Sequence, residues 1–282
     1  MRSAAFAFCL LAVVGLAGCR ATESHPGWES PLERRADGIR VLTDGPGGFA
    51  DDLIAQWRTL QSTVKASPFA PLADCNREVT AYVFASSDEY REFADGQRMS
   101  PLSYGCYRVS LCSLYIGPPA TPADRARFET TARHELAHHL HYALTRWAGP
   151  IRPWLSEGLA EWLARGERTC RDDFLVLRLC DIVVDKGVST EDRLARLIGL
   201  QGDTNLVERA RAYTLVRALA EDPTTRDRFA DYVLHRAKFE DDLDALCSAL
   251  GVTSADICKV YERTYEAIDR AFVAADETRA GR

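Results

Sequence analysis

The sequence predicts an α+β fold, with a small β-sheet and helices in the N-terminal half and a mostly helical C-terminal half. Two observations lead to this class. Short segments with alternating or β-branched residues fall before residue 117, as is typical of strands. From residue 121 onward, apolar residues recur at helical spacing. We expect the chemistry to lie where the two halves meet.

The N-terminus is typical of an export signal. Arg2 precedes an apolar run from Ala4 to Gly18, which has the length of a secretory h-region and is short for a membrane span. The run ends in Leu-Ala-Gly-Cys, which resembles a bacterial lipobox. That resemblance implies cleavage after residues 1–18 and a lipid on Cys19, which would hold an exported protein on a cell-envelope membrane, facing the periplasm or the exterior. An ordinary signal peptide with an incidental cysteine is the alternative.

The rest of the chain carries no second apolar run of membrane-spanning length, so we expect its body to be soluble. The formal net charge is −6, and basic residues form no cluster. This balance argues against nucleic acid as a partner and against electrostatic docking on anionic lipid.

Cysteine usage fits an exported protein, in which disulfides persist. Besides Cys9 in the signal and Cys19, seven cysteines remain: Cys75, Cys106, Cys112, Cys170, Cys180, Cys247 and Cys258. Near neighbours would give three pairs and leave Cys75 single: Cys106–Cys112, Cys170–Cys180 and Cys247–Cys258. The sequence alone does not fix this connectivity. Metal binding by these thiols is disfavoured because no C-x-x-C pair is present.

The elements of the first half follow from local patterns. Residues 19–37 are polar and broken by Pro and Gly, so we expect a flexible tether ahead of one domain at 38–275 and a frayed tail at 276–282. Apolar residues at helical spacing predict a helix over 49–65. The other elements expected before residue 117 are strands at 38–43, 79–84, 104–109 and 111–116 and a short helix at 87–95.

Two helices are expected at the junction of the halves. Thr121 and Pro122 are typical of the cap and first position of a helix, which should run to about residue 147, before Gly149-Pro150 breaks it. Pro153 starts the next helix, to about residue 165. Further helices are expected at 190–200, 205–221, 225–237, 239–250 and 254–275.

The first of these two helices carries the motif His-Glu-Leu-Ala-His at residues 134–138. Residues i and i+4 lie about 40° apart around a helix axis, so His134 and His138 can bind one zinc ion. Glu135 lies about 100° away, close enough to reach a metal-activated water without binding the metal itself. The motif alone also occurs by chance, so its context decides.

The second helix supplies that context. It reads Pro-Trp-Leu-Ser-Glu-Gly-Leu-Ala-Glu-Trp at residues 153–162, and 18 residues separate His138 from Glu157. Here the chain resembles the gluzincin metallopeptidases, and most of all the bacterial peptidase-MA-like domains, often lipoproteins. The resemblance is specific over 134–162 and looser over 38–270. It implies a gluzincin-like domain with one zinc ion on His134, His138 and Glu157.

Further roles follow from the same resemblance. It implies that Glu135 is the general base and that Glu161 is a second carboxylate that orients His134. Glu161 could equally be a solvent-facing helix charge. Tyr213 matches the position of a tyrosine that donates to the developing oxyanion, with a half-buried core tyrosine as the alternative. We also expect Gly158 to let its helix approach the helix of residues 121–147 closely.

The remaining histidines near the motif are weaker candidates. His141 lies three residues past His138 and could bind metal, but the Glu157 helix would then have no role. His139 faces elsewhere and is expected to cap or pack.

Gluzincins pair an extended peptide with a sheet-edge strand, for which residues 111–117 are the candidate. The Gly-x-Met-Glu-Asn motif of the aminopeptidase branch is missing. We therefore expect a metalloendopeptidase rather than an aminopeptidase, acting on a peptide or protein. Two alternatives stay open: a non-catalytic zinc-containing envelope binding protein, and a zinc amidase acting on peptidoglycan stem peptides.

Overall fold

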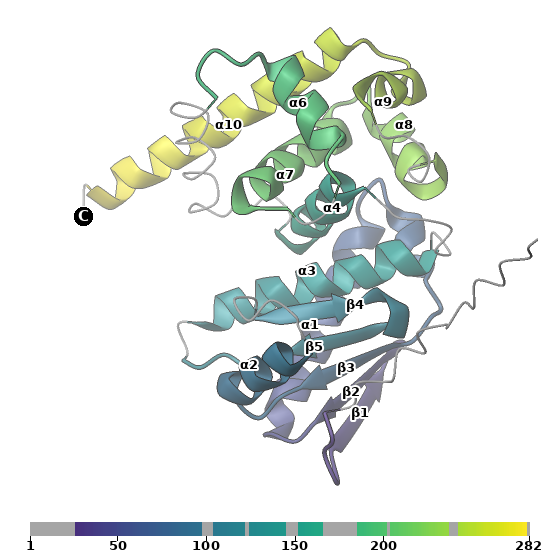
Figure 1. Cartoon of the computed structure of the whole chain (residues 1–282), viewed down its shortest axis with the longest axis vertical. Helices are drawn as coiled ribbons and strands as arrows, with labels where there is room; N and C mark the ends of the chain where they lie inside the picture. Colours follow the sequence, from purple (N-terminus) through teal and green to yellow (C-terminus); the bar gives the residue numbers. More distant parts are fainter. Residues whose placement is uncertain are drawn as a thin grey trace, which may run out of the picture.

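A mixed five-stranded sheet forms the N-terminal half of the protein (Figure 1). The computed structural model describes residues 26–97, 104–121, 124–144, 152–165, 185–201, 204–236 and 242–280. The sheet order is β1-β2-β3-β5-β4, in which β2, β3 and β5 are parallel and the two edge strands are antiparallel to their neighbours. The strands are β1 (Leu32–Ala36), β2 (Ile39–Thr43), β3 (Val79–Val83), β4 (Gly105–Arg108) and β5 (Ser113–Ile116).

Side chains alternate between the two faces of the sheet along each strand, and helices cover both of these faces. On β3, Ala81 belongs to the larger core, in which α1 (Gly47–Lys65) packs, with the short 3₁₀ helix η1 (Ala70–Asp74) beside it. Tyr82 points to the other face and stacks on the neighbouring strand's Tyr115, beneath α2 (Ser87–Gly96). The fold class is α+β, as the sequence predicted.

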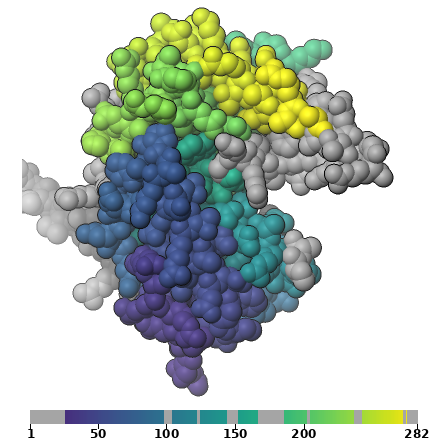
Figure 2. Space-filling model, turned by 180° about the vertical axis from the view of Figure 1, so that it is seen from behind, coloured from purple at the N-terminus to yellow at the C-terminus, as the bar shows by residue number. Residues whose placement is uncertain are grey.

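The C-terminal half of the described chain is helical (Figure 1). From behind, the helical half caps one end of the sheet half (Figure 2). Two helices join the halves: α3 packs against α1 and β4, and α4 packs between α3 and α7. The helices from this point are α3 (Arg125–Leu144), α4 (Pro153–Arg165), α6 (Thr190–Ile198), α7 (Leu206–Glu221), α8 (Arg226–Asp231), the π-helical turn η4 (Tyr232–Arg236), α9 (Leu243–Leu250) and α10 (Ser254–Ala280).

The structure departs from the sequence prediction at both ends of the domain. Residues 32–36 fall inside the expected tether, yet they form β1 and pair antiparallel with β2. The strand escaped prediction because most of its side chains are exposed, which leaves no apolar alternation to detect. Residues 276–280 fall inside the expected frayed tail and instead continue α10. The expected signal peptide and Cys19 lie outside the described residues.

The expected substrate-pairing strand is a second correction. Residues 113–116 form β5, which lies between β3 and β4 and is therefore not an edge strand. The free edge on this side belongs to β4, the first strand of the β4–β5 hairpin. A short 3₁₀ helix, η2 (Val109–Leu111), connects the two strands. Sequence order alone did not show which strand of the hairpin inserts beside β3.

The cysteines of the described chain are unpaired, so the expected bonds Cys106–Cys112 and Cys247–Cys258 are not present in this structure. The reason is clear for the first pair. Cys106 alternates with Tyr107 along β4, whereas Cys112 lies beside the Tyr107 hydroxyl, on the opposite face of the sheet. Cys75 is also free, and Cys170 and Cys180 lie outside the described residues. Among the described helices, none combines the length and the apolarity that a membrane span requires.

Candidate metal centre

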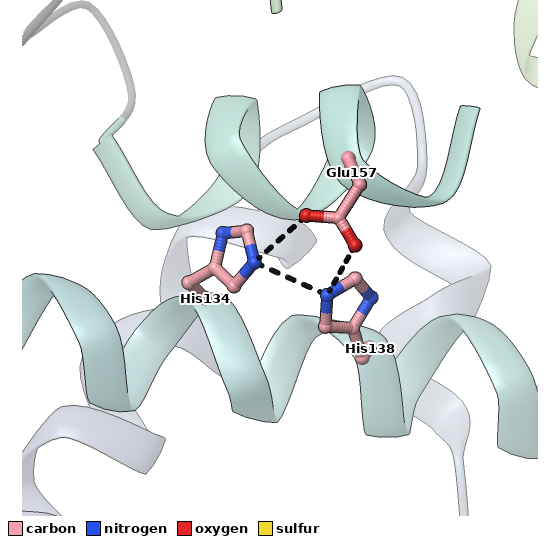
Figure 3. Close-up of side chains that lie close together, drawn as sticks. All are labelled: His134, His138 and Glu157. Carbon is pink, nitrogen blue, oxygen red and sulfur yellow. Dashed lines mark hydrogen bonds and ion pairs between the residues drawn. The ribbon is translucent and has the colours of Figure 1, made fainter. Parts of the chain in front are cut away.

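The predicted ligands converge between α3 and α4 (Figure 3). His134 and His138 project from one face of α3, as their spacing of four residues requires. Glu157 lies near the start of α4, which begins at Pro153 and packs against α3. All three side chains are largely buried, with 9 %, 11 % and 19 % of their side-chain surface exposed.

The spacing of the three ligand groups matches a tetrahedral metal. The two Nε2 atoms of His134 and His138 are 3.1 Å apart. The Glu157 carboxylate places Oε2 3.4 Å from His134 Nε2 and Oε1 3.5 Å from His138 Nε2. A zinc ion with bonds of about 2.0–2.1 Å in tetrahedral geometry keeps its ligand atoms about 3.3 Å apart. The trio therefore has the dimensions of one face of a zinc tetrahedron.

Side chains from α4 lie beside the other ring nitrogens of both histidines. His138 Nδ1 lies 3.1 Å from Ser156 Oγ, which in turn donates to the hydroxyl of Tyr142 at 3.5 Å. His134 Nδ1 lies 3.4 Å from Glu161 Oε1, and Arg165 pairs with the same carboxylate. Such outer partners fix ring orientation and leave Nε2 for a metal. Sequence analysis anticipated Glu161 but missed Ser156, which no motif spacing singles out.

Glu135 lies on an adjoining face of α3 and is tied to the sheet. Its Oε2 accepts a hydrogen bond of 2.8 Å from the backbone N–H of Tyr107, on the edge strand β4. Burial raises the pKa of Glu135 to about 7, the charge of Glu157 adds to this, and His134 opposes it. The carboxylate is thus anchored by one oxygen and sits within electrostatic range of two of the three ligands.

His139 has a structural role. Its Nε2 lies 3.0 Å from the carbonyl oxygen of Arg77 and its Nδ1 lies 3.0 Å from the Tyr107 hydroxyl. Because a carbonyl only accepts, Nε2 carries the proton and Nδ1 accepts from Tyr107. His139 also packs against Trp57. It is fully buried, in line with the expectation that it packs.

His141 is buried but does not join the ligand group, which among the described residues consists of the predicted three. Burial lowers the pKa of His141 to about 4. Trp154 and Trp162, on α4, are buried as well.

The surroundings shift the pKa values of the two ligand imidazoles in opposite directions. Burial is the strongest influence on each and would lower both pKa values. For His134 the surrounding carboxylates of Glu161, Glu157 and Glu135 outweigh it and raise the pKa to about 9. For His138 burial wins, opposed by Glu157 and assisted by the charge of His134, and the pKa falls to about 3. Two imidazoles this close share a single positive charge, which a bound cation would replace with release of the proton.

A second observation also indicates that these three side chains suit a divalent cation. Glu157 Oε2 is buried and has no hydrogen-bond partner within the described part of the chain; His134 Nε2 and Arg209 Nε lie 3.4 Å away. Burial would raise the pKa of Glu157, but His138, His134 and Arg209 together hold it below its usual range. A buried, ionised oxygen without a hydrogen bond is costly unless cations lie beside it; Arg209 is one, and a metal ion shared with His134 and His138 would be a second. Two imidazoles and one carboxylate are the donor set of catalytic zinc sites.

The helix that approaches Gly158 closely differs from the expected one. A methyl group on Gly158 would lie 2.5 Å from the carbonyl oxygen of Ala212, so the glycine allows close approach of α7 rather than α3. On α7, Tyr213 is buried and its hydroxyl accepts from Arg217 Nη1 at 3.3 Å. Its role as oxyanion donor stays a prediction.

Comparison with known proteins does not assign a family. No protein-family model matches the chain, and no curated protein sequence is significantly similar to it.

Proposed function

We propose that the chain is a zinc-dependent hydrolase of the gluzincin type, and specifically a metallopeptidase that cleaves an amide bond within a peptide or protein. The observation that carries the proposal is the set of distances, 3.1 to 3.5 Å, between the Nε2 atoms of His134 and His138 and the Glu157 carboxylate. These three residues would hold one zinc ion. The ion would supply Lewis acidity, which activates water and polarises a substrate carbonyl.

Glu135 is the proposed general base. Its Oε2 is held by the Tyr107 N–H, so the carboxylate is fixed in orientation and Oε1 is left for proton transfer. Glu135 would accept a proton from the attacking water and pass it to the departing nitrogen, giving a carboxylic acid and an amine. Glu161 and Ser156 would keep the two imidazoles oriented, and Tyr213 would donate to the developing oxyanion.

The cellular setting is part of the proposal. An export signal ending at Cys19 would place the enzyme on an envelope membrane, facing the periplasm or the exterior. Its substrate would then be an envelope or secreted protein. Peptidoglycan stem peptides are the alternative substrate.

The isosteric substitution Glu135→Gln tests the proposal, with Glu129→Gln as its matched control. Glu129 is a half-buried residue of the same helix that pairs with Arg125. We expect about one zinc ion per chain in the wild type and in both variants. Hydrolysis should fall roughly 100- to 10,000-fold in Glu135→Gln only, the usual contribution of general acid–base catalysis. Zinc is measured by mass spectrometry, and hydrolysis on casein, a peptide library and purified sacculi.

The outcomes separate the candidate functions. Cleavage of sacculi but not of casein would favour an amidase acting on stem peptides. Bound zinc with no turnover on any substrate would favour a non-catalytic envelope binding protein. Equal turnover by Glu135→Gln and the wild type would contradict the assigned role of Glu135.

A further inference from the structure

One charged side chain at the metal centre comes from α7 rather than from the two helices that carry the three ligands. Arg209, in the first turn of α7, places its Nε 3.4 Å from Glu157 Oε2. The same Nε donates to Thr204 Oγ1 at 3.3 Å. The guanidinium is therefore anchored by its inner edge, directly beside the proposed metal site.

The outer edge of this guanidinium is available. The Arg209 side chain is 43 % exposed, whereas Glu157 beside it is 19 % exposed. Within the described part of the chain, neither Nη atom of Arg209 has a hydrogen bond or ion pair. A guanidinium presents its donors as a planar fork that matches a carboxylate, with two parallel N–H···O bonds.

With a divalent metal ion bound, the charges of the site would no longer compensate this arginine. The carboxylates of Glu135 and Glu157 would together balance a divalent ion, because imidazoles are neutral when they bind metal. Glu161 already pairs with Arg165. Arg209 then contributes one surplus positive charge, at the exposed rim of an otherwise buried site.

We propose that Arg209 is a carboxylate-binding element that selects substrates with a negative charge next to the scissile bond. This inference rests on the proposed hydrolase function. A carboxylate held by the two Nη atoms would lie roughly 8 Å or less from Glu157 Oε2, about one or two residues along an extended chain. The group could be the free C-terminus of the substrate or the side chain of an Asp or Glu.

Three matched peptides distinguish these sources. The first is neutral with an amidated C-terminus, the second has the same sequence with a free C-terminal carboxylate, and the third is amidated with Glu one residue from the cleavage site. We expect the wild type to cleave one or both charged peptides 10- to 100-fold better than the neutral one, as for a charge-assisted hydrogen bond. Preference for the second peptide would identify the C-terminus, and preference for the third an acidic side chain.

The variant Arg209→Gln should lose this preference, so that it cleaves the two charged peptides no faster than the neutral one. Arg270→Gln is the control, since Arg270 is an exposed arginine on α10 whose partner is Glu266. An equal slowing of all three peptides, or loss of zinc from Arg209→Gln, would show that Arg209 acts on Glu157 and would overturn the inference.

A binding measurement separates failure of this inference from failure of the proposed function. Calorimetry compares two peptide hydroxamates, one with a free C-terminal carboxylate or a Glu side chain and one fully amidated. Tighter binding of the charged probe, lost in Arg209→Gln, would support carboxylate recognition even if no peptide were cleaved. Equal affinity for both probes would overturn it even if peptides were cleaved, and absence of zinc from the protein would refute both proposals.

Discussion

His138 and His139 are neighbours on α3, both buried, and burial lowers the pKa of both, to about 3 and about 4. The partners of their ring nitrogens nevertheless differ. Both nitrogens of His139 have protein partners, the Tyr107 hydroxyl and the Arg77 carbonyl. His138 Nδ1 contacts Ser156, whereas its Nε2 lies 3.1 Å from His134 Nε2 and 3.5 Å from the Glu157 carboxylate.

This difference teaches how a ligand histidine is recognised without a bound metal. Burial and a lowered pKa do not separate the two residues. The second ring nitrogen separates them. In His139 it contacts a complementary protein group, whereas in His138 it faces other atoms that can themselves bind a cation. On this criterion His138 belongs to the proposed metal centre and His139 to the structural core.

The largest expected difference between His138 and His139 is in their contribution to zinc affinity. We expect His138→Ala to weaken zinc binding on the order of 1,000-fold, because loss of an outer partner alone typically costs 10- to 100-fold. His139→Ala should keep about one zinc ion per chain. Competition with a chelating dye measures both affinities. Comparable zinc loss in the two variants would show that the two histidines are not functionally distinct.

Stability should show the opposite order. In chelator-treated protein, His139→Ala should lower the free energy of unfolding by about 3 kcal/mol, because it opens a cavity and removes two hydrogen bonds, one with the Tyr107 hydroxyl and one with the Arg77 carbonyl. His138→Ala should cost less than about 1 kcal/mol, since it also removes a close contact between two imidazoles. Urea unfolding monitored by circular dichroism checks this order. A larger loss in His138→Ala would contradict the assignment.

Local signals explain what the sequence predicted well. The bounds expected for the second helix of the site, 153–165, agree with α4, because Pro153 is typical of the first position of a helix. The i, i+4 histidines and Glu157 came together as expected because the first two share one helix face and the third lies on the next helix.

Features that depend on distant neighbours were not predictable. The residue that packs on Gly158 is Ala212, 54 positions later, so its helix partner could not be read from local pattern. The insertion of β5 beside β3 depends on sheet pairing in the same way. Arg209 and Ser156 belong to no motif, and their positions beside the ligands follow only from how α7 and α4 pack.

The smallest expected effects come from removing one hydrogen bond to His138 and one to His139. Ser156→Ala deletes the partner of His138 Nδ1 and should weaken zinc binding 10- to 100-fold, with little change in the stability of chelator-treated protein.

Tyr107→Phe deletes the partner of His139 Nδ1 and should lower stability by about 1 kcal/mol while zinc affinity stays within threefold. It leaves the backbone N–H that holds Glu135 in place, so hydrolysis should also change little. Zinc titration and urea unfolding on both variants form one experiment. Loss of zinc affinity in Tyr107→Phe would mean that the structural network of His139 also sets the geometry of the metal ligands, and the two neighbouring histidines would then act as one unit.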